Sequence, residues 1–101
     1  MPKQNPKDKI FKSTQPILVD FYADWCGPCQ TMDPIIDEVL SDLNGKVKLL
    51  KINVDRNPQL AQQFGVRSIP HYIVFKSGKI LWRKGGIIMK KDLVKALSNF
   101  K

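Results

Sequence analysis

Two cysteines separated by two residues are the part of the sequence best suited to chemistry. They stand in the run Trp25-Cys26-Gly27-Pro28-Cys29, between an apolar segment typical of a buried strand and a segment with helical spacing. A thiol at a helix N-terminus receives free backbone N–H groups and the positive end of the helix dipole, which stabilise its thiolate. Cys26 is therefore the predicted attacking thiol. Cys29 is within disulfide reach and is predicted to face inward, where burial raises the pKa of a thiol.

The residues between the cysteines predict a preformed loop. Gly27 lets another chain approach closely, and Pro28 occupies a first-turn position where its missing N–H costs nothing. Two other interpretations stay open from the residues alone: a pair of inert half-buried cysteines, and half of a zinc site. Four-coordinate zinc needs two further ligands, and the sequence offers only His71 besides the two cysteines, so we predict no metal site. A lone histidine on a strand is more often a packing or surface group.

A carboxylate and a lysine interrupt the predicted strands. Asp20 shares a face of its strand with Leu18 and Tyr22, so the pleat holds its carboxylate against an apolar layer. Burial would raise its pKa toward neutrality and suit it to accept the proton of Cys29. The residues equally allow an edge-strand aspartate or a simple ion-pair partner for Lys51. That lysine is either partly buried beside an acidic group or a surface residue with a buried stem.

Hydrophobic periodicity predicts the elements that position these residues. A strand, a helix and a strand in succession give a right-handed parallel crossover, and a β-hairpin then adds antiparallel strands. The fold class is therefore α/β, with a mixed sheet of about four strands and helices on both faces. The predicted elements are a strand at 17–22, a helix from near Cys26 to Asn44-Gly45 with Pro34 inside it, a strand at 47–54, a short helix from Asn57-Pro58 to Gly65, hairpin strands at 71–75 and 80–83, and a terminal helix carrying Leu93, Val94, Leu97 and Phe100.

Length and composition predict one soluble domain. The chain has 101 residues, 43% of them hydrophobic and 26% charged, and no apolar run reaches the roughly 18 residues that cross a bilayer. Residues 1–15 are predicted to form a loose arm with room for one helical turn, ahead of a domain at 16–101. The first residues carry no apolar stretch resembling a secretion signal. The net charge of +8 lies in the second half, which favours either a solvated surface or attraction to acidic partners.

The run from Val19 to Cys29 resembles the active-site stretch of the thioredoxin family. The resemblance continues through Pro34, the segment 51–55 and the segment 65–70, and covers about residues 16–101. It implies a thioredoxin fold whose first strand is shortened or absent, because residues 1–15 show no strand pattern. It also implies a dithiol–disulfide oxidoreductase that reduces protein disulfides through a mixed disulfide.

The resemblance also implies roles for individual residues. Cys26 matches the attacking thiol, Cys29 the resolving thiol, Asp20 the buried proton acceptor and Lys51 its partner. The proline matching Pro70 is cis in the family and lets the residue before it pair with an extended substrate. The implied substrate-binding residues are Trp25, Gly27, Pro28, Ile69, Pro70, Gly85, Gly86 and Ile87. Tyr22, His71, Gly85 and Ile87 depart from common family residues and leave the substrate list open.

The implied partners are disulfide-containing proteins and an NADPH-dependent, flavin-containing thioredoxin reductase. The family needs no resident cofactor, and we expect a cytoplasmic monomer that binds neither nucleic acid nor membranes. Two alternatives remain. One is a thiol oxidase or isomerase of exported proteins whose signal was removed before Met1. The other is a non-redox structural or nucleic-acid-associated protein, which the basic second half motivates.

Overall fold

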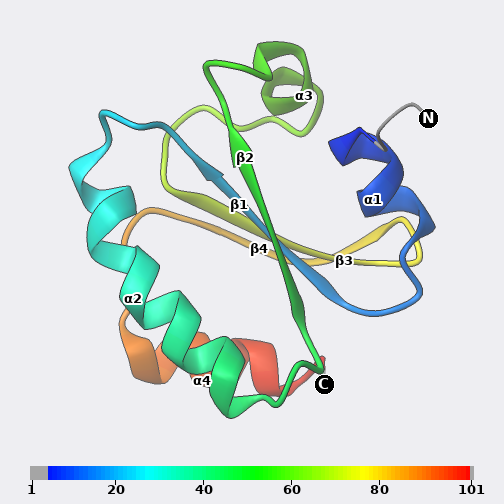
Figure 1. Cartoon of the computed structure of the whole chain (residues 1–101), viewed down its shortest axis with the longest axis vertical. Helices are drawn as coiled ribbons and strands as arrows, with labels where there is room; N and C mark the ends of the chain where they lie inside the picture. The colour runs from blue at the N-terminus through cyan, green and yellow to red at the C-terminus, as the bar shows by residue number, and fades with distance from the viewer. Residues whose placement is uncertain (1–4, 101) are drawn as a thin grey trace.

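The computed structural model describes residues 5–100 and contains one mixed sheet (Figure 1). The strands lie in the order β2-β1-β3-β4, with β1 parallel to β2 and antiparallel to β3, and with β3 antiparallel to β4. This confirms the predicted four-stranded mixed sheet flanked by helices. In chain order the elements are α1 (Pro6–Lys12), β1 (Ile17–Tyr22), α2 (Gly27–Asp42), β2 (Lys48–Asn53), α3 (Pro58–Gln63), β3 (His71–Lys76), β4 (Lys79–Gly85) and α4 (Lys90–Ser98).

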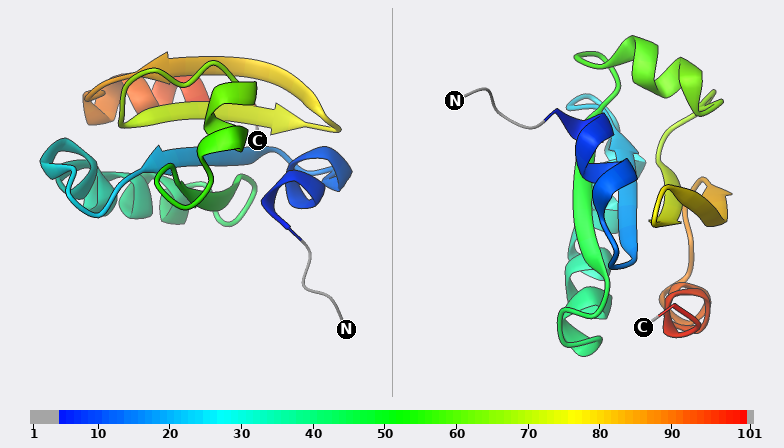
Figure 2. Two further views of the ribbon diagram at one scale, coloured as in Figure 1. Left: turned by 90° about the horizontal axis from the view of Figure 1, so that it is seen from above. Right: turned by 90° about the vertical axis from the view of Figure 1, so that its right-hand side faces the viewer.

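Strand β1 is the centre of the fold, and its apolar run is buried on both faces, as predicted for a central strand. Leu18 packs into a cluster that includes Ile36 of α2 and Leu93 of α4. Phe21 points to the opposite face and packs with Ile10 of α1 and Ala61 of α3. Figure 2 shows the resulting layers, with α2 and α4 on one side of the sheet and α1 and α3 on the other.

The prediction of a loose N-terminal arm is wrong for residues 6–12, which form α1. The Asn5 side chain caps this helix by accepting a hydrogen bond from the Asp8 N–H at 2.9 Å. Ile10 is completely buried in the core, and the Phe11 ring lies 6.1 Å from that of Phe64. These two apolar side chains anchor the helix, so α1 belongs to the same core as residues 16–100. The rest of the predicted arm before Asn5 lies outside the described residues.

The ends of the elements set the borders of the site. Helix α2 begins directly after Cys26 and includes Pro34. Beyond its C-terminus Asn44 and Gly45 have φ angles of 54° and 74°, the left-handed conformation that a helix stop requires. Among residues 5–100 no strand pairs with the outer edge of β2, as expected from the shortened first strand. Within the same range, the helices are all too short or too polar to cross a membrane.

Candidate active site

The two cysteines form a disulfide across the first turn of α2, with their Cα atoms 5.3 Å apart. Cys26 is the N-cap residue, and its sulfur accepts a hydrogen bond from the backbone N–H of Cys29 at 3.1 Å. Pro28 occupies the first turn, as predicted. Because the Cys29 N–H at the helix start points at the sulfur of Cys26, a thiolate there would be stabilised by this hydrogen bond and by the helix dipole.

Burial distinguishes the two cysteines less than we expected. The exposed fraction is 3% for Cys26 and 4% for Cys29, because Ala23, Tyr22 and Ile69 pack around the disulfide. The prediction that Cys29 is buried is confirmed. Cys26 is buried as well in this oxidised state, so exposure does not separate the two sulfurs and only the position at the helix start does.

A cis peptide bond joins Ile69 to Pro70 beside the disulfide, as the family resemblance implied. The N–H of Gly86 donates to the carbonyl oxygen of Pro70 at 2.8 Å and so ties the loop after β4 to the cis-proline loop. A Cβ atom at Gly85 would lie 3.1 Å from Nδ1 of His71, tighter than an ordinary van der Waals contact. Gly85 therefore fits closely against His71, the residue that follows Pro70.

An open groove of about 310 Å³ lies between Trp25 and Ile69. The Trp25 side chain is 71% exposed, and its Nε1–H donates to Oδ2 of Asp55 at 2.8 Å, which holds the indole over the groove. Ile87 is also exposed, and so are Gly27 and Pro28 at the start of α2. The groove is lined by Trp25, Val54, Ala61, Val66, Arg67, Ser68 and Ile69.

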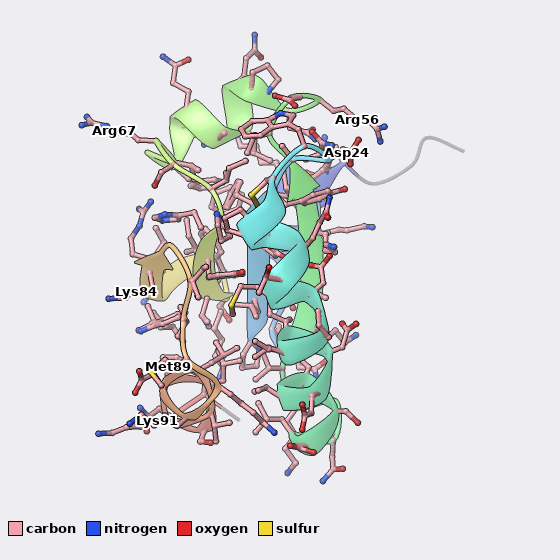
Figure 3. The ribbon with its side chains drawn as sticks, turned by 90° about the vertical axis from the view of Figure 1, so that its left-hand side faces the viewer. Asp24, Arg56, Arg67, Lys84, Met89 and Lys91 are labelled. Atoms are coloured by element: carbon pink, nitrogen blue, oxygen red, sulfur yellow. A yellow bond between two sulfur atoms is a disulfide. The ribbon has the colours of Figure 1, made fainter. Side chains whose placement is uncertain are left out.

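Sequence reasoning missed most of this lining. Val54 stands at the end of the strand predicted at 47–54, and Val66 is an apolar residue after the short helix. Asp55 showed no link to Trp25, which is 30 positions away. Only the fold brings them together, so no local pattern signals them. Figure 3 shows Arg67 and Lys84 on one side of the α2 N-terminus and Asp24 with Arg56 on the other.

Asp20 lies on the central strand with only 2% of its surface exposed. The edge-strand alternative is therefore wrong, because β2 and β3 flank β1 on both sides. Burial raises the pKa of Asp20 to about 6; the positive charge of Lys51 opposes this rise, and the negative charge of Asp33 adds to it. The carboxyl group thus titrates close to neutral pH, which is the range a proton acceptor needs.

Lys51 faces Asp20 across the β1–β2 register, but its ion pair is with another residue. Its Nζ lies 3.1 Å from Oδ1 of Asp33 on α2, at side-chain exposures of 38% and 39%, and 4.7 Å from the centre of the Tyr22 ring. The direct Asp20–Lys51 pair that the sequence allowed is thus replaced by an Asp33–Lys51 pair. Lys51 acts on Asp20 through its charge, and Asp33 is a member of the site that the sequence did not indicate.

His71, the residue after Pro70, accepts a hydrogen bond from Arg83. Nε of Arg83 donates to its Nε2 at 3.2 Å, and Nη2 of Arg83 also donates to the carbonyl oxygen of Phe64 at 2.6 Å. Burial and then the Arg83 charge lower the pKa of His71, so the ring is neutral near pH 7. Within the described part of the chain, no group of three or more His, Cys, Asp or Glu side chains is placed to hold a metal ion.

Comparisons with known proteins agree with this geometry. The family model for thioredoxin matches residues 1–99. A thioredoxin of Rickettsia felis is 47% identical over 88 residues, which cover 87% of this chain and 84% of the relative. Thioredoxin 1 of a Nostoc species is 43% identical over 91 residues, covering 90% and 85%. The crystal structure of thioredoxin NaTrxh from Nicotiana alata has a TM-score of 0.83 at 34% identity and covers 94% of this chain and 81% of that one.

A Cys-x-x-Cys disulfide at the start of a helix, on a mixed sheet of this topology, defines a thiol–disulfide oxidoreductase. The chain belongs to the thioredoxin family. It is accordingly a thiol–disulfide reductase that acts on disulfide-containing proteins. The interpretations with inert cysteines or with a purely structural role are thereby set aside.

Proposed function

We propose that Cys26 attacks the substrate disulfide, that Cys29 releases the product and that Asp20 accepts the proton of Cys29. The observation that carries the order of attack is the N-cap position of Cys26, whose sulfur already accepts the Cys29 N–H. The same bond stabilises a thiolate more strongly than a neutral thiol, because hydrogen bonds to charged acceptors are the stronger ones. Cys29 lies inside the first turn, so its sulfur is not at the N-cap and does not accept this hydrogen bond.

The exchange proceeds in two balanced steps. The Cys26 thiolate attacks one sulfur of the substrate disulfide, a Cys26–substrate disulfide forms, and the second substrate sulfur leaves as a thiolate. Cys29 then loses its proton and attacks the sulfur of Cys26, which closes the intramolecular disulfide and releases the first substrate sulfur. Two electrons pass to the substrate, and the chain ends in the oxidised form described above.

Asp20 suits the proton step by position and by proton affinity. It shares its face of β1 with Leu18, which packs on α2, and with Tyr22, which packs on the disulfide, so its carboxylate faces the layer that also holds Cys29. With a pKa of about 6, the carboxyl group is mostly ionised at pH 7 and still basic enough to take a proton. Lys51, paired with Asp33, tunes this affinity by its charge.

The substrate segment binds along the cis-proline loop in an extended conformation. The backbone of Ile69 pairs with it as an added strand, Pro70 sits against the sulfurs, and Trp25 with Ile87 supplies the apolar rim. Gly27 and Pro28 leave room for the approaching chain, as do Gly85 and Gly86 on the opposite loop. The roughly 310 Å³ groove beside Ile69 receives a substrate side chain.

We further infer that a flavin-dependent reductase uses NADPH to re-reduce the disulfide, and that the chain works as a monomer in the cytoplasm.

In a mixture of NADPH, a bacterial thioredoxin reductase and insulin, we expect NADPH oxidation that depends on the chain and matches the thiols formed. Cys26→Ser should reduce the rate to background. If the chemically reduced chain cleaves insulin disulfides but the reductase and NADPH never re-reduce it, the proposed recharging partner is wrong and the reductase activity stands.

A further inference from the structure

Tyr72 is placed directly opposite Asp20 in the sheet. The two residues are partners in the antiparallel register of β1 and β3, so their side chains leave the same face at neighbouring positions. Tyr72 is 1% exposed and Asp20 is 2% exposed. A tyrosine buried at such a position normally directs its hydroxyl to a polar partner.

Each of the two residues has a buried polar atom without a hydrogen-bond partner in the described part of the oxidised chain. Oδ1 of Asp20 and the hydroxyl of Tyr72 are buried, and neither has a hydrogen-bond partner among residues 5–100. Buried polar atoms are almost always hydrogen-bonded, because desolvating them without a partner is costly. A hydrogen bond between the two residues would satisfy both atoms, because the carboxylate oxygen is an acceptor and the hydroxyl carries a donor hydrogen.

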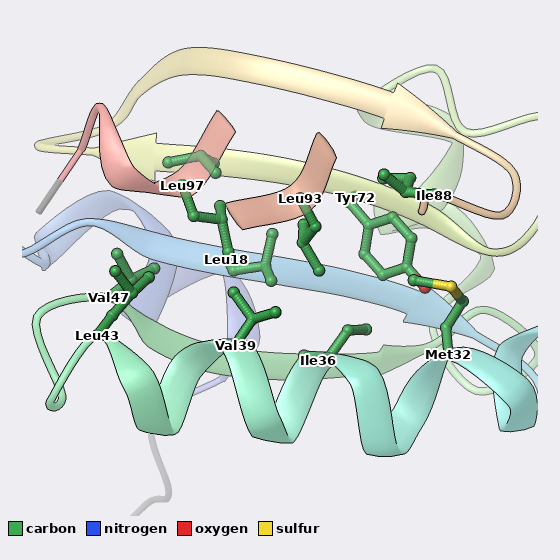
Figure 4. Close-up of a cluster of buried hydrophobic side chains, with 11 residues drawn as sticks. Leu18, Met32, Ile36, Val39, Leu43, Val47, Tyr72, Ile88, Leu93 and Leu97 are labelled. Atoms are coloured by element: carbon green, nitrogen blue, oxygen red, sulfur yellow. The ribbon is translucent and has the colours of Figure 1, made fainter. Parts of the chain in front are cut away.

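The hydroxyl also lies in the layer that the proposed proton step uses. Figure 4 shows the Tyr72 ring extending from β3 toward α2, with its hydroxyl end directed at Met32. Cys29 precedes Met32 by one helical turn on the buried face of α2. Tyr72 therefore stands between the sheet and α2 on the same side as both the proton donor and the proposed acceptor.

The charged groups next to Asp20 pair with each other, and Tyr22 on its own strand lies under the Lys51 ammonium. Lys51 on β2 and Asp33 on α2 are bonded to each other, and the α4 side chains of this cluster are Leu93 and Leu97. Burial raises the pKa of Tyr72, and the charges of Asp20 and Asp33 raise it further, so the phenol keeps its hydrogen near neutral pH. Tyr72 is thus a permanent donor facing a carboxyl group that changes charge.

We propose that the Tyr72 hydroxyl donates a hydrogen bond to the ionised Asp20 carboxylate, directly or through one water, and so acts as a positioning residue for proton transfer from Cys29. This inference rests on the proposed role of Asp20 as proton acceptor. It adds a hydrogen-bond donor on β3 that stabilises the Asp20 carboxylate. The phenolic hydrogen stays on Tyr72 throughout. The hydrogen bond stabilises the carboxylate before the transfer and weakens when Asp20 becomes protonated.

Titration of Asp20 tests this bond without any measurement of activity. In the oxidised chain carrying ¹³C-labelled aspartate, Tyr72→Phe keeps the ring and removes the donor, so the Asp20 midpoint should rise by about one pH unit. Tyr22→Phe removes a hydroxyl from a half-buried neighbour on β1 and should move that midpoint far less. An unchanged or lowered midpoint in Tyr72→Phe, or equal shifts in both variants, would overturn the proposal.

The kinetics of product release separate this proposal from the proposed function of Asp20. With a preformed Cys26 mixed disulfide, the pH midpoint of release should shift upward in Tyr72→Phe, and the variant Asp20→Asn should lose that dependence. If the titration moves as expected but release keeps one pH profile in all variants, the hydrogen bond stands and the proton-acceptor role of Asp20 fails. If Asp20→Asn changes release and Tyr72→Phe leaves the titration unmoved, only the Tyr72 proposal fails.

Discussion

Replacing Cys29 by serine is expected to convert the reductase into a trap for its substrates. Cys26 keeps its position at the start of α2 and still attacks, but a serine hydroxyl cannot displace the mixed disulfide. Most of the variant should therefore become covalently linked to disulfide-bonded proteins when it is mixed, reduced, with an extract of its host. The adducts should be visible by non-reducing electrophoresis and should dissolve in dithiothreitol.

Cys26→Ser is the matched control for this experiment. It removes one sulfur from the same disulfide and leaves a thiol at position 29, which lacks the N-cap position of Cys26. Far fewer adducts are expected with this variant. Equal trapping by both variants, or stronger trapping by Cys26→Ser, would contradict the assignment of Cys26 as the attacking thiol.

Asp20→Asn should stabilise the fold at neutral and alkaline pH. The pKa of Asp20 rises from 3.8 to about 6 on folding, so the folded chain binds the proton more tightly than the unfolded chain. The stability that this group contributes is therefore fully present below pH 4 and is lost as the pH rises through 6. Asparagine carries no charge, so the variant should gain about 2–3 kcal/mol in free energy of unfolding at pH 8 and almost nothing at pH 4.

Urea unfolding of both proteins across this pH range measures the effect. Asp37→Asn, the same substitution at an exposed position of α2, should change stability by less than about 0.5 kcal/mol at every pH. Asp20→Asn should also slow release of the mixed disulfide about tenfold to a hundredfold near pH 7. A stability gain that does not vary with pH would show that Asp20 is not the buried titrating group described here.

Local patterns predicted the elements that carry the cysteines. The run Ile17–Tyr22 indicated a strand buried on both faces, and it is β1 with those limits. Apolar spacing and the Asn44-Gly45 stop indicated the long helix, and the cysteine at its start became the N-cap. These features depend on residues that are close together in the sequence, where periodicity and turn chemistry are decisive.

Contacts between distant elements were not accessible in this way. The Lys51–Asp33 pair joins β2 to α2 and depends on how the helix crosses the sheet. The opposition of Tyr72 and Asp20 depends on the register of two strands that are far apart in sequence. The anchoring of α1 through Ile10 required a core that forms only when the chain is folded. The cis state of Pro70 came from the family resemblance, because the residues around it carry no local signal for it.

The reduction potential of the Cys26–Cys29 pair tests the central claim most directly. The chain is equilibrated with glutathione buffers of defined potential, the thiols are alkylated, and the disulfide fraction is read by mass spectrometry. A protein-disulfide reductase of this family should give a midpoint near the value of about −270 mV known for thioredoxins. A midpoint near about −120 mV, the range of strong thiol oxidants, would contradict the reductase function and favour a thiol oxidase of exported proteins instead.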